Sequence, residues 1–140
     1  MNPPKSSSAT PRAVADVVND IYAAFARRDM ARVFSLFSPE IEIVQSTQLP
    51  WGDVYRGHDG AREFMGKLTR RINSTVVVER LIIAGDRVVA MGWTRGTVNA
   101  TGASYDVPIA HVWQIRDGAA VRVEFYIDHP TMLAALGARS

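Results

Sequence analysis

The chemistry available to this sequence centres on histidine, because its 140 residues include three histidines and no cysteine. One of them, His111, stands in the middle of an apolar run, residues 109–113 (IAHVW). An imidazole with an ordinary pKa of about 6.5 can give or take a proton near neutral pH. The alternative is a neutral core histidine that bonds to a neighbour, since a buried polar group without a partner costs about 1 to 3 kcal/mol. The sequence alone leaves both roles open.

The other two histidines offer less. His58 and His129 lie beside Gly and Pro in expected loops, where exposed, non-functional side chains are usual. No two histidines have ligand spacing with a carboxylate, so no metal is predicted, and no other cofactor is expected. Without cysteine there are no disulfides, thiolate nucleophiles or Cys-ligated zinc.

Composition narrows the class of protein. The 16 basic and 14 acidic side chains leave a net charge of +2, and no Lys/Arg cluster could follow phosphates, so nucleic acid is not an expected partner. No 18 consecutive residues are apolar, and the first ten residues contain no apolar h-region. We therefore expect neither a membrane span nor secretion, and a cytoplasmic protein is the simplest prediction.

The elements that would position His111 begin after residues 1–9, which are rich in Pro and Ser and predict a mobile tail. Residues 10–140 predict a single domain. Thr10 followed by Pro11 predicts a helix start, with apolar residues at helical spacing to about Arg28. Asp29 caps a second helix that ends before Pro39, and Asp59 caps a third.

The second half of the chain has the pattern of a sheet. A strand is predicted at residues 41–46 and a long ordered loop at 47–60. An antiparallel meander follows, with strands at 75–84, 87–99, 104–116 and 119–127. Gly-Asp, Thr-Gly and Asp-Gly turns separate these strands. Asp128 then caps a terminal helical turn. Helices first and a meander later indicate an α+β domain, with the helices on one face of the sheet.

Four segments carry a resemblance to a known family: ARRDMARVFSLFSPEIEI, VYRGHDGAREFM, HVWQIRDG and FYID. In this order they resemble the nuclear transport factor 2-like (NTF2-like) superfamily, from Val14 to about Leu136, and especially its SnoaL-like and ketosteroid isomerase-like branches. The resemblance implies a cone, in which a curved, mostly antiparallel sheet wraps around the three helices of the N-terminal half and encloses a pocket. It also implies that the outer face of the sheet makes a homodimer.

The ketosteroid isomerase residues transfer poorly. The position of their general base, an aspartate, matches Gln45, which cannot take a proton. Their oxyanion-hole carboxylic acid falls at His111, and their oxyanion-hole tyrosine falls at Ile21, next to Tyr22. The resemblance therefore does not imply steroid isomerisation.

Two other groups of relatives give a similar result. The catalytic arginine and aspartate of limonene epoxide hydrolases match Gly92 and Thr94, and Ile43 replaces a water-positioning tyrosine. Their second aspartate matches Phe125, as does the last-strand acid of SnoaL-type polyketide cyclases, which keep a histidine near His111. Epoxide hydrolysis is not expected either.

These matches agree on which side chains face the cone interior, because alternate residues of a strand share a face. The expected interior set is Ile43, Gln45, Gly92, Thr94, Val107, Ile109, His111, Trp113, Val123, Phe125 and Ile127. Glu42, Asp106 and Glu124 then point outward, so the strands bring no carboxylate to the pocket for acid/base chemistry. The face of Glu79, and whether Asp53 reaches the pocket, remain open.

Two functions follow as hypotheses. The first is an isomerase, cyclase or lyase that moves a proton on a small apolar carbonyl compound, with His111 as acid/base. Its expected substrate-binding residues are Tyr22, Gln45, Trp51, Asp53, Tyr55, Thr94, Ile109, Trp113 and Phe125. The alternative is a non-catalytic module that binds a hydrophobic ligand or serves dimeric assembly, and the sequence does not decide whether the protein is an enzyme. Outward Trp93 and Tyr126 favour a homodimer through the outer face.

Overall fold

The computed structural model describes residues 11–137, so the predicted tail and the predicted helix cap at Thr10 lie outside the described residues. The elements follow in the order α1 (Pro11–Ala26), α2 (Met30–Ser35), β1 (Phe37–Gln45), β2 (Asp53–Arg56), α3 (Gly57–Arg71), β3 (Ile72–Ala84), β4 (Arg87–Val98), β5 (Ser104–Arg116), β6 (Ala119–Ile127) and α4 (His129–Ala135). Among these residues no helix combines the length and apolarity that crossing a bilayer requires.

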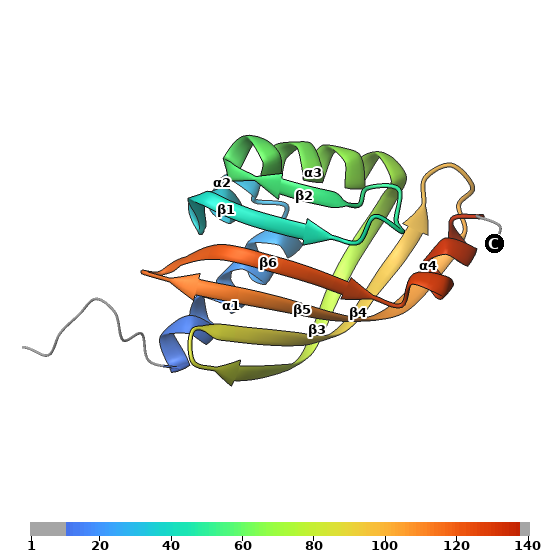
Figure 1. Ribbon diagram of the computed structural model, residues 1–140. Coiled ribbons are helices and arrows are strands. Elements are labelled where there is room, and N and C mark those ends of the chain that lie inside the picture. Colours follow the sequence, from blue (N-terminus) through green and yellow to red (C-terminus); the bar gives the residue numbers. More distant parts are fainter. Residues whose placement is uncertain (1–10, 138–140) are drawn as a thin grey trace, which may run out of the picture.

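The strands form one curved sheet in the order β2-β1-β6-β5-β4-β3. Only β1 and β6 pair in parallel; every other neighbouring pair is antiparallel, which confirms the predicted meander and the α+β class. Figure 1 shows α1 and α2 behind the sheet and α3 along the edge formed by β1 and β2. The helices α1, α2 and α3 therefore cover the concave face of the sheet, and the other face is convex (Figure 1).

Local sequence explains how the first two helices meet. Val14, Val18 and Ile21 form a buried stripe on α1. The helix ends at Ala26, and Arg28 takes a left-handed conformation with a φ of 59° that turns the chain. The Asp29 carboxylate then accepts a hydrogen bond from the backbone N–H of Arg32, which confirms the predicted cap of the second helix.

The prediction of one long loop at residues 47–60 was wrong for the second half of this segment. Residues 53–56 form β2, which pairs with β1, and α3 begins at Gly57. The N-cap of α3 is therefore Arg56, while Asp59 lies in the first turn, where a carboxylate is favourable to the helix dipole. A four-residue edge strand needs its partner to form, and local pattern does not reveal that partner.

Two strand starts also differ from the prediction. β1 begins at Phe37 and includes Pro39, and β3 begins at Ile72, directly after α3. An extra residue in β3, between Val78 and Arg80, bulges the pairing with β4. Gly92 lies opposite this bulge, where a β-carbon would come within 1.9 Å of the Val77 carbonyl oxygen, so only glycine fits there.

Candidate functional site

Sheet register brings the predicted site residues into one row. Gln45 on β1 is paired with Phe125 on β6, and Phe125 is paired with His111 on β5. Paired residues in adjacent strands share a face, so all three side chains point toward the helices. Thr94 joins the same face because β4 pairs it with Val107 of β5.

These side chains line a cavity of about 100 Å³ between the sheet and the helices. Its wall consists of Ile21, Tyr22, Phe25, Val33, Phe37, Ile43, Gln45, Trp51, Phe64, Met65, Leu68, Ile72, Ser74, Val76, Thr94, Ile109, His111, Trp113, Phe125, Ile127 and Met132. The volume is somewhat below the ~150 Å³ of an apolar cavity that holds benzene. Most of these lining residues are apolar, and none of the described ones is Asp, Glu, Lys or Arg.

His111 is held by two aromatic residues. The Tyr22 hydroxyl lies 2.7 Å from Nδ1 of His111, and Trp113 donates its indole N–H to the same hydroxyl oxygen at 2.9 Å. The Tyr22 hydroxyl oxygen accepts the indole N–H of Trp113, so the hydroxyl proton is free to be donated to His111. Nδ1 of His111 is therefore the acceptor. A neutral imidazole then carries its proton on Nε2, which has no hydrogen-bond partner among the described residues.

Burial changes the electrostatics of this histidine. Desolvation lowers the pKa of His111 from 6.5 to about 3, and no carboxylate of the described residues lines the cavity beside the ring to oppose the effect. Burial also raises the pKa of the Tyr22 hydroxyl, against a smaller lowering by the hydrogen bond from Trp113. Both groups are therefore neutral at pH 7, and the ordinary histidine pKa assumed from the sequence does not apply. The neutral ring is a weak base but a good hydrogen-bond donor.

Gln45 forms a second polar group on the cavity wall. Its side-chain oxygen accepts the Trp51 indole N–H at 3.3 Å, which orients the amide. Its Nε2 is buried and makes no hydrogen bond to any described residue. Tyr55 stands behind this pair, donating its hydroxyl to the Trp51 carbonyl oxygen at 2.7 Å. A third polar group is the hydrogen-bonded pair of hydroxyls from Ser74 and Thr94.

The acidic residues near the sheet lie outside the cavity. Asp53 is exposed at the start of β2, and its carboxylate accepts a hydrogen bond from the backbone N–H of Val54. Glu79 accepts the indole N–H of Trp93 on the convex face, which settles its orientation. Asp106 pairs with Arg95 at 2.8 Å on that same face. Neither Asp53 nor Tyr55 touches the cavity, so the structure does not bring these two predicted binding residues to the site.

With the geometry established, comparison with known proteins identifies the family. A family model described as "SnoaL-like domain" matches residues 18–123. The chain belongs to this family. The match confirms the resemblance that the sequence motifs indicated. None of the curated proteins matches this SnoaL-like domain.

Solved structures agree with the fold of this SnoaL-like domain. An NTF2-like protein from Burkholderia thailandensis is 31% identical, with a TM-score of 0.82 over 91% of this chain and 98% of that chain. An NTF2-like protein of unknown function from Burkholderia pseudomallei is 27% identical, with a TM-score of 0.84 over 90% and 98%. TerC, co-crystallised with polyporic acid, is 25% identical, with a TM-score of 0.83 over 90% and 99%.

The prediction that the other two histidines lie in exposed loops was wrong. His58 is in the first turn of α3, half-buried, with Nε2 2.9 Å from the carbonyl oxygen of Phe37. His129 begins α4, also half-buried, and its Nε2 is buried without a partner among residues 11–137. Neither lines the cavity, and within the described chain no three His, Asp or Glu side chains cluster as a metal site would require.

Sequence reasoning missed the helical half of the cavity wall. Phe25 on α1, Phe64 and Met65 on α3, and Ser74 at the start of β3 all line it. The helical spacing of Phe25, Phe64 and Met65 indicates that these side chains face inward, but it does not distinguish a cavity wall from solid packing. No such spacing indicates Ser74, which lies on β3. The role of Tyr22 was only half predicted, because the family match fell on Ile21; both residues line the cavity.

Proposed function

We propose that this protein binds a small, mainly apolar carbonyl compound in the cavity, with the carbonyl oxygen accepting a hydrogen bond from Nε2–H of His111. One observation carries the proposal: the chain of bonds from Trp113 through Tyr22 to Nδ1 of His111 leaves the opposite ring nitrogen as an unused donor. An apolar cavity with one or two convergent polar groups is typical of small-molecule sites.

Two further features support a neutral ligand with an acceptor oxygen. The buried amide nitrogen of Gln45 is a second donor without a partner among the described residues, and a small shift of its side chain would turn it to a ligand. An anion in the inner cavity would meet no cation there, because no Lys or Arg is among its described lining residues. The likeness to TerC, which was co-crystallised with polyporic acid, also supports an organic ligand for this chain.

The proposal favours binding and polarisation over proton abstraction. A histidine with a pKa of about 3 is too weak a base to take a proton from carbon near neutral pH, and no carboxylate of the described residues lines the cavity. A neutral imidazole can still polarise a carbonyl by donating a hydrogen bond. The second candidate function, an isomerase, cyclase or lyase, rests on this polarisation, with the proton taken by a basic group of the ligand itself, because water is a weaker base than this imidazole.

The test compares a ketone with a hydrocarbon of the same shape. Cyclohexanone and methylenecyclohexane would be titrated into the wild type and into His111→Phe, which has no N–H donor, and the affinities measured by NMR line shapes. We expect the ratio of ketone affinity to hydrocarbon affinity to be about fivefold higher in the wild type than in the variant, equivalent to roughly 1 kcal/mol for one hydrogen bond, because this comparison cancels the different hydration of the two probes. The same affinity ratio in both proteins would contradict the proposal.

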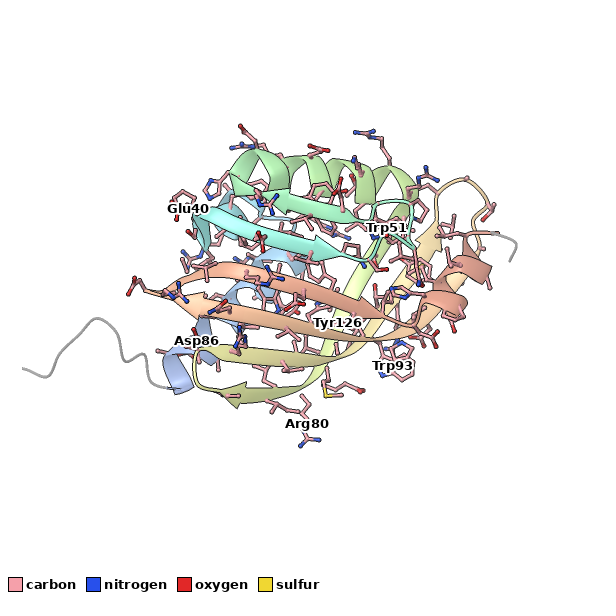
Figure 2. The ribbon with its side chains drawn as sticks, in the orientation of Figure 1. Glu40, Trp51, Arg80, Asp86, Trp93 and Tyr126 are labelled. Carbon is pink, nitrogen blue, oxygen red and sulfur yellow. The ribbon has the colours of Figure 1, made fainter. Side chains whose placement is uncertain are left out.

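We also propose that the convex face of the sheet forms a homodimer interface. Tyr126 and Met91 are 51% and 41% exposed there, beside half-buried Trp93, and Figure 2 shows Trp93 projecting away from the sheet. The polar tips of the two aromatic residues are already bonded to Glu79 and Glu124, so neither ring would bring an unpaired donor into the interface. Such a patch is more apolar than an ordinary wet sheet face.

A further inference from the structure

An open recess adjoins the inner cavity on the side of α1, α3 and β3. It has a volume of about 540 Å³ and shares with the inner cavity the side chains Phe25, Met65, Leu68, Ile72 and Ser74. We call these shared residues the neck, because each of them lines both spaces. A ligand whose head lies beside His111 and whose tail passes between the neck side chains would reach the recess.

The polar lining of the recess differs from that of the inner cavity. It includes Arg28, Thr69, Asn73 and Asn99, and no Asp or Glu is among its described lining residues. A smaller recess of about 60 Å³, on the other side of Phe25, is also lined by Arg28 and again by no described acid. The outer end of the pocket is thus cationic, whereas the inner end is neutral.

Arg28 is held in place by its backbone and its neighbours. Its left-handed φ of 59° ends the turn after α1, where its N–H bonds to the Phe25 carbonyl oxygen at 2.9 Å. Its guanidinium lies over the Phe25 ring, 5.3 Å from the centroid, and donates to the Ser74 carbonyl oxygen at 3.1 Å and to Oδ1 of Asn73 at 3.4 Å. All of these contacts are made with residues at the neck or the recess.

The charge of Arg28 is nevertheless unpaired within the described chain. The nearby Arg27 and Arg32 form ion pairs with Asp29 and Asp20, but no carboxylate of residues 11–137 lies within ion-pair distance of Arg28. The two hydrogen bonds of Arg28 use one of its terminal nitrogens, so most of its five donors stay available, in a geometry that suits a carboxylate.

From these observations we infer that the ligand carries a carboxylate, which Arg28 binds in the recess while the carbonyl head occupies the inner cavity. This inference rests on the function proposed above and deepens it, because it names the substrate class: an apolar keto acid. The Nδ2 group of Asn73, whose Oδ1 already accepts from Arg28, supplies a second donor for the same carboxylate.

The test uses cyclohexanones that carry a carboxylate on alkyl spacers of increasing length, with their methyl esters as neutral controls. We expect one spacer length at which the acid binds the wild type about fivefold more tightly than its ester, as for a charge-assisted bond to an exposed arginine. Arg28→Gln should abolish the preference for the acid over its own ester, Arg28→Lys should keep part of it, and Arg27→Gln should keep all of it.

The outcomes separate this inference from the proposed function. If the esters bind and shift the His111 resonances but no acid is preferred at any spacer length, the carboxylate inference is overturned and the proposed function stands. If the acids bind through Arg28 without shifting His111, the recess binds anions and the proposed carbonyl contact is wrong. If neither acids nor esters bind, both are overturned. A preference that survives in Arg28→Gln would also overturn the assignment to Arg28.

Discussion

Acidification should destabilise this protein through His111 in particular. In the folded chain burial lowers the pKa of His111 to about 3, against about 6.5 in the unfolded chain. Between these two values the unfolded state binds a proton that the folded state excludes. Stability from this group is therefore fully present above pH 6.5 and is lost as the pH falls toward 3, with a slope of about 1.4 kcal/mol per pH unit.

The loss of stability between pH 7 and pH 5 can be calculated from the same two pKa values. At pH 7 the unfolded imidazole is mostly neutral, and the loss is close to zero. At pH 5 it is almost fully protonated, 1.5 units below the unfolded value, so the loss is about 2 kcal/mol. This is a large share of the 5 to 15 kcal/mol that usually stabilises a domain.

The assay is urea unfolding, followed by tryptophan fluorescence, of the wild type and His111→Gln at both pH values. The substitution adds a constant change in stability, but this cancels when the pH 7 to pH 5 difference is compared between the two proteins. Other titrating groups contribute to both proteins and cancel as well. We expect the wild type to lose about 2 kcal/mol more than the variant. A difference below about 0.5 kcal/mol would refute a desolvated His111, because an exposed imidazole keeps the same pKa in both states.

Three further predictions concern the wall of the cavity and the sheet. Tyr22→Phe should lower the free energy of unfolding in urea by about 2 to 4 kcal/mol, because it leaves His111 Nδ1 and the Trp113 N–H without partners. The control Tyr126→Phe, on the surface, should lower it by less than about 0.5 kcal/mol. Equal losses in the two variants would argue against the hydrogen-bonded group of Tyr22, His111 and Trp113. Gly92→Ala should lower the free energy of unfolding by about 3 kcal/mol or more, since its new methyl group meets the Val77 carbonyl oxygen. The control Gly66→Ala, in α3, should be neutral or slightly stabilising. A Gly92→Ala variant as stable as the wild type would contradict the bulged β3–β4 pairing. Light scattering should give the mass of two chains for the wild type and of one chain for Tyr126→Lys, and a wild type of one-chain mass at micromolar concentration would exclude the proposed dimer.

The sheet interior was predictable because strand alternation is a strict rule. Once Gln45 and His111 were placed on strands, the period of two fixed which of their neighbours face inward, and the observed register agrees. The outward orientation of the strand carboxylates followed from the same rule, and with it the lack of an acid on the cavity wall.

What the sequence could not supply depends on contacts between distant segments. β2 is only four residues long and exists through its pairing with β1, so residues 53–56 looked like loop. The choice between Ile21 and Tyr22 depends on the rotation of α1 against the sheet, which helical spacing does not fix to one residue. The lowered pKa of His111 arises from burial among residues that are distant in the sequence, a property that local sequence does not contain.

The central claim is that His111 presents a neutral Nε2–H to the cavity. Long-range ¹H–¹⁵N correlation NMR of the imidazole at pH 7, with and without cyclohexanone, tests it most directly. We predict the tautomer that is protonated on Nε2 alone, and a change in the Nε2 resonance when the ketone binds. An imidazolium, a tautomer protonated on Nδ1, or a ring that does not respond to bound ketone would contradict this account.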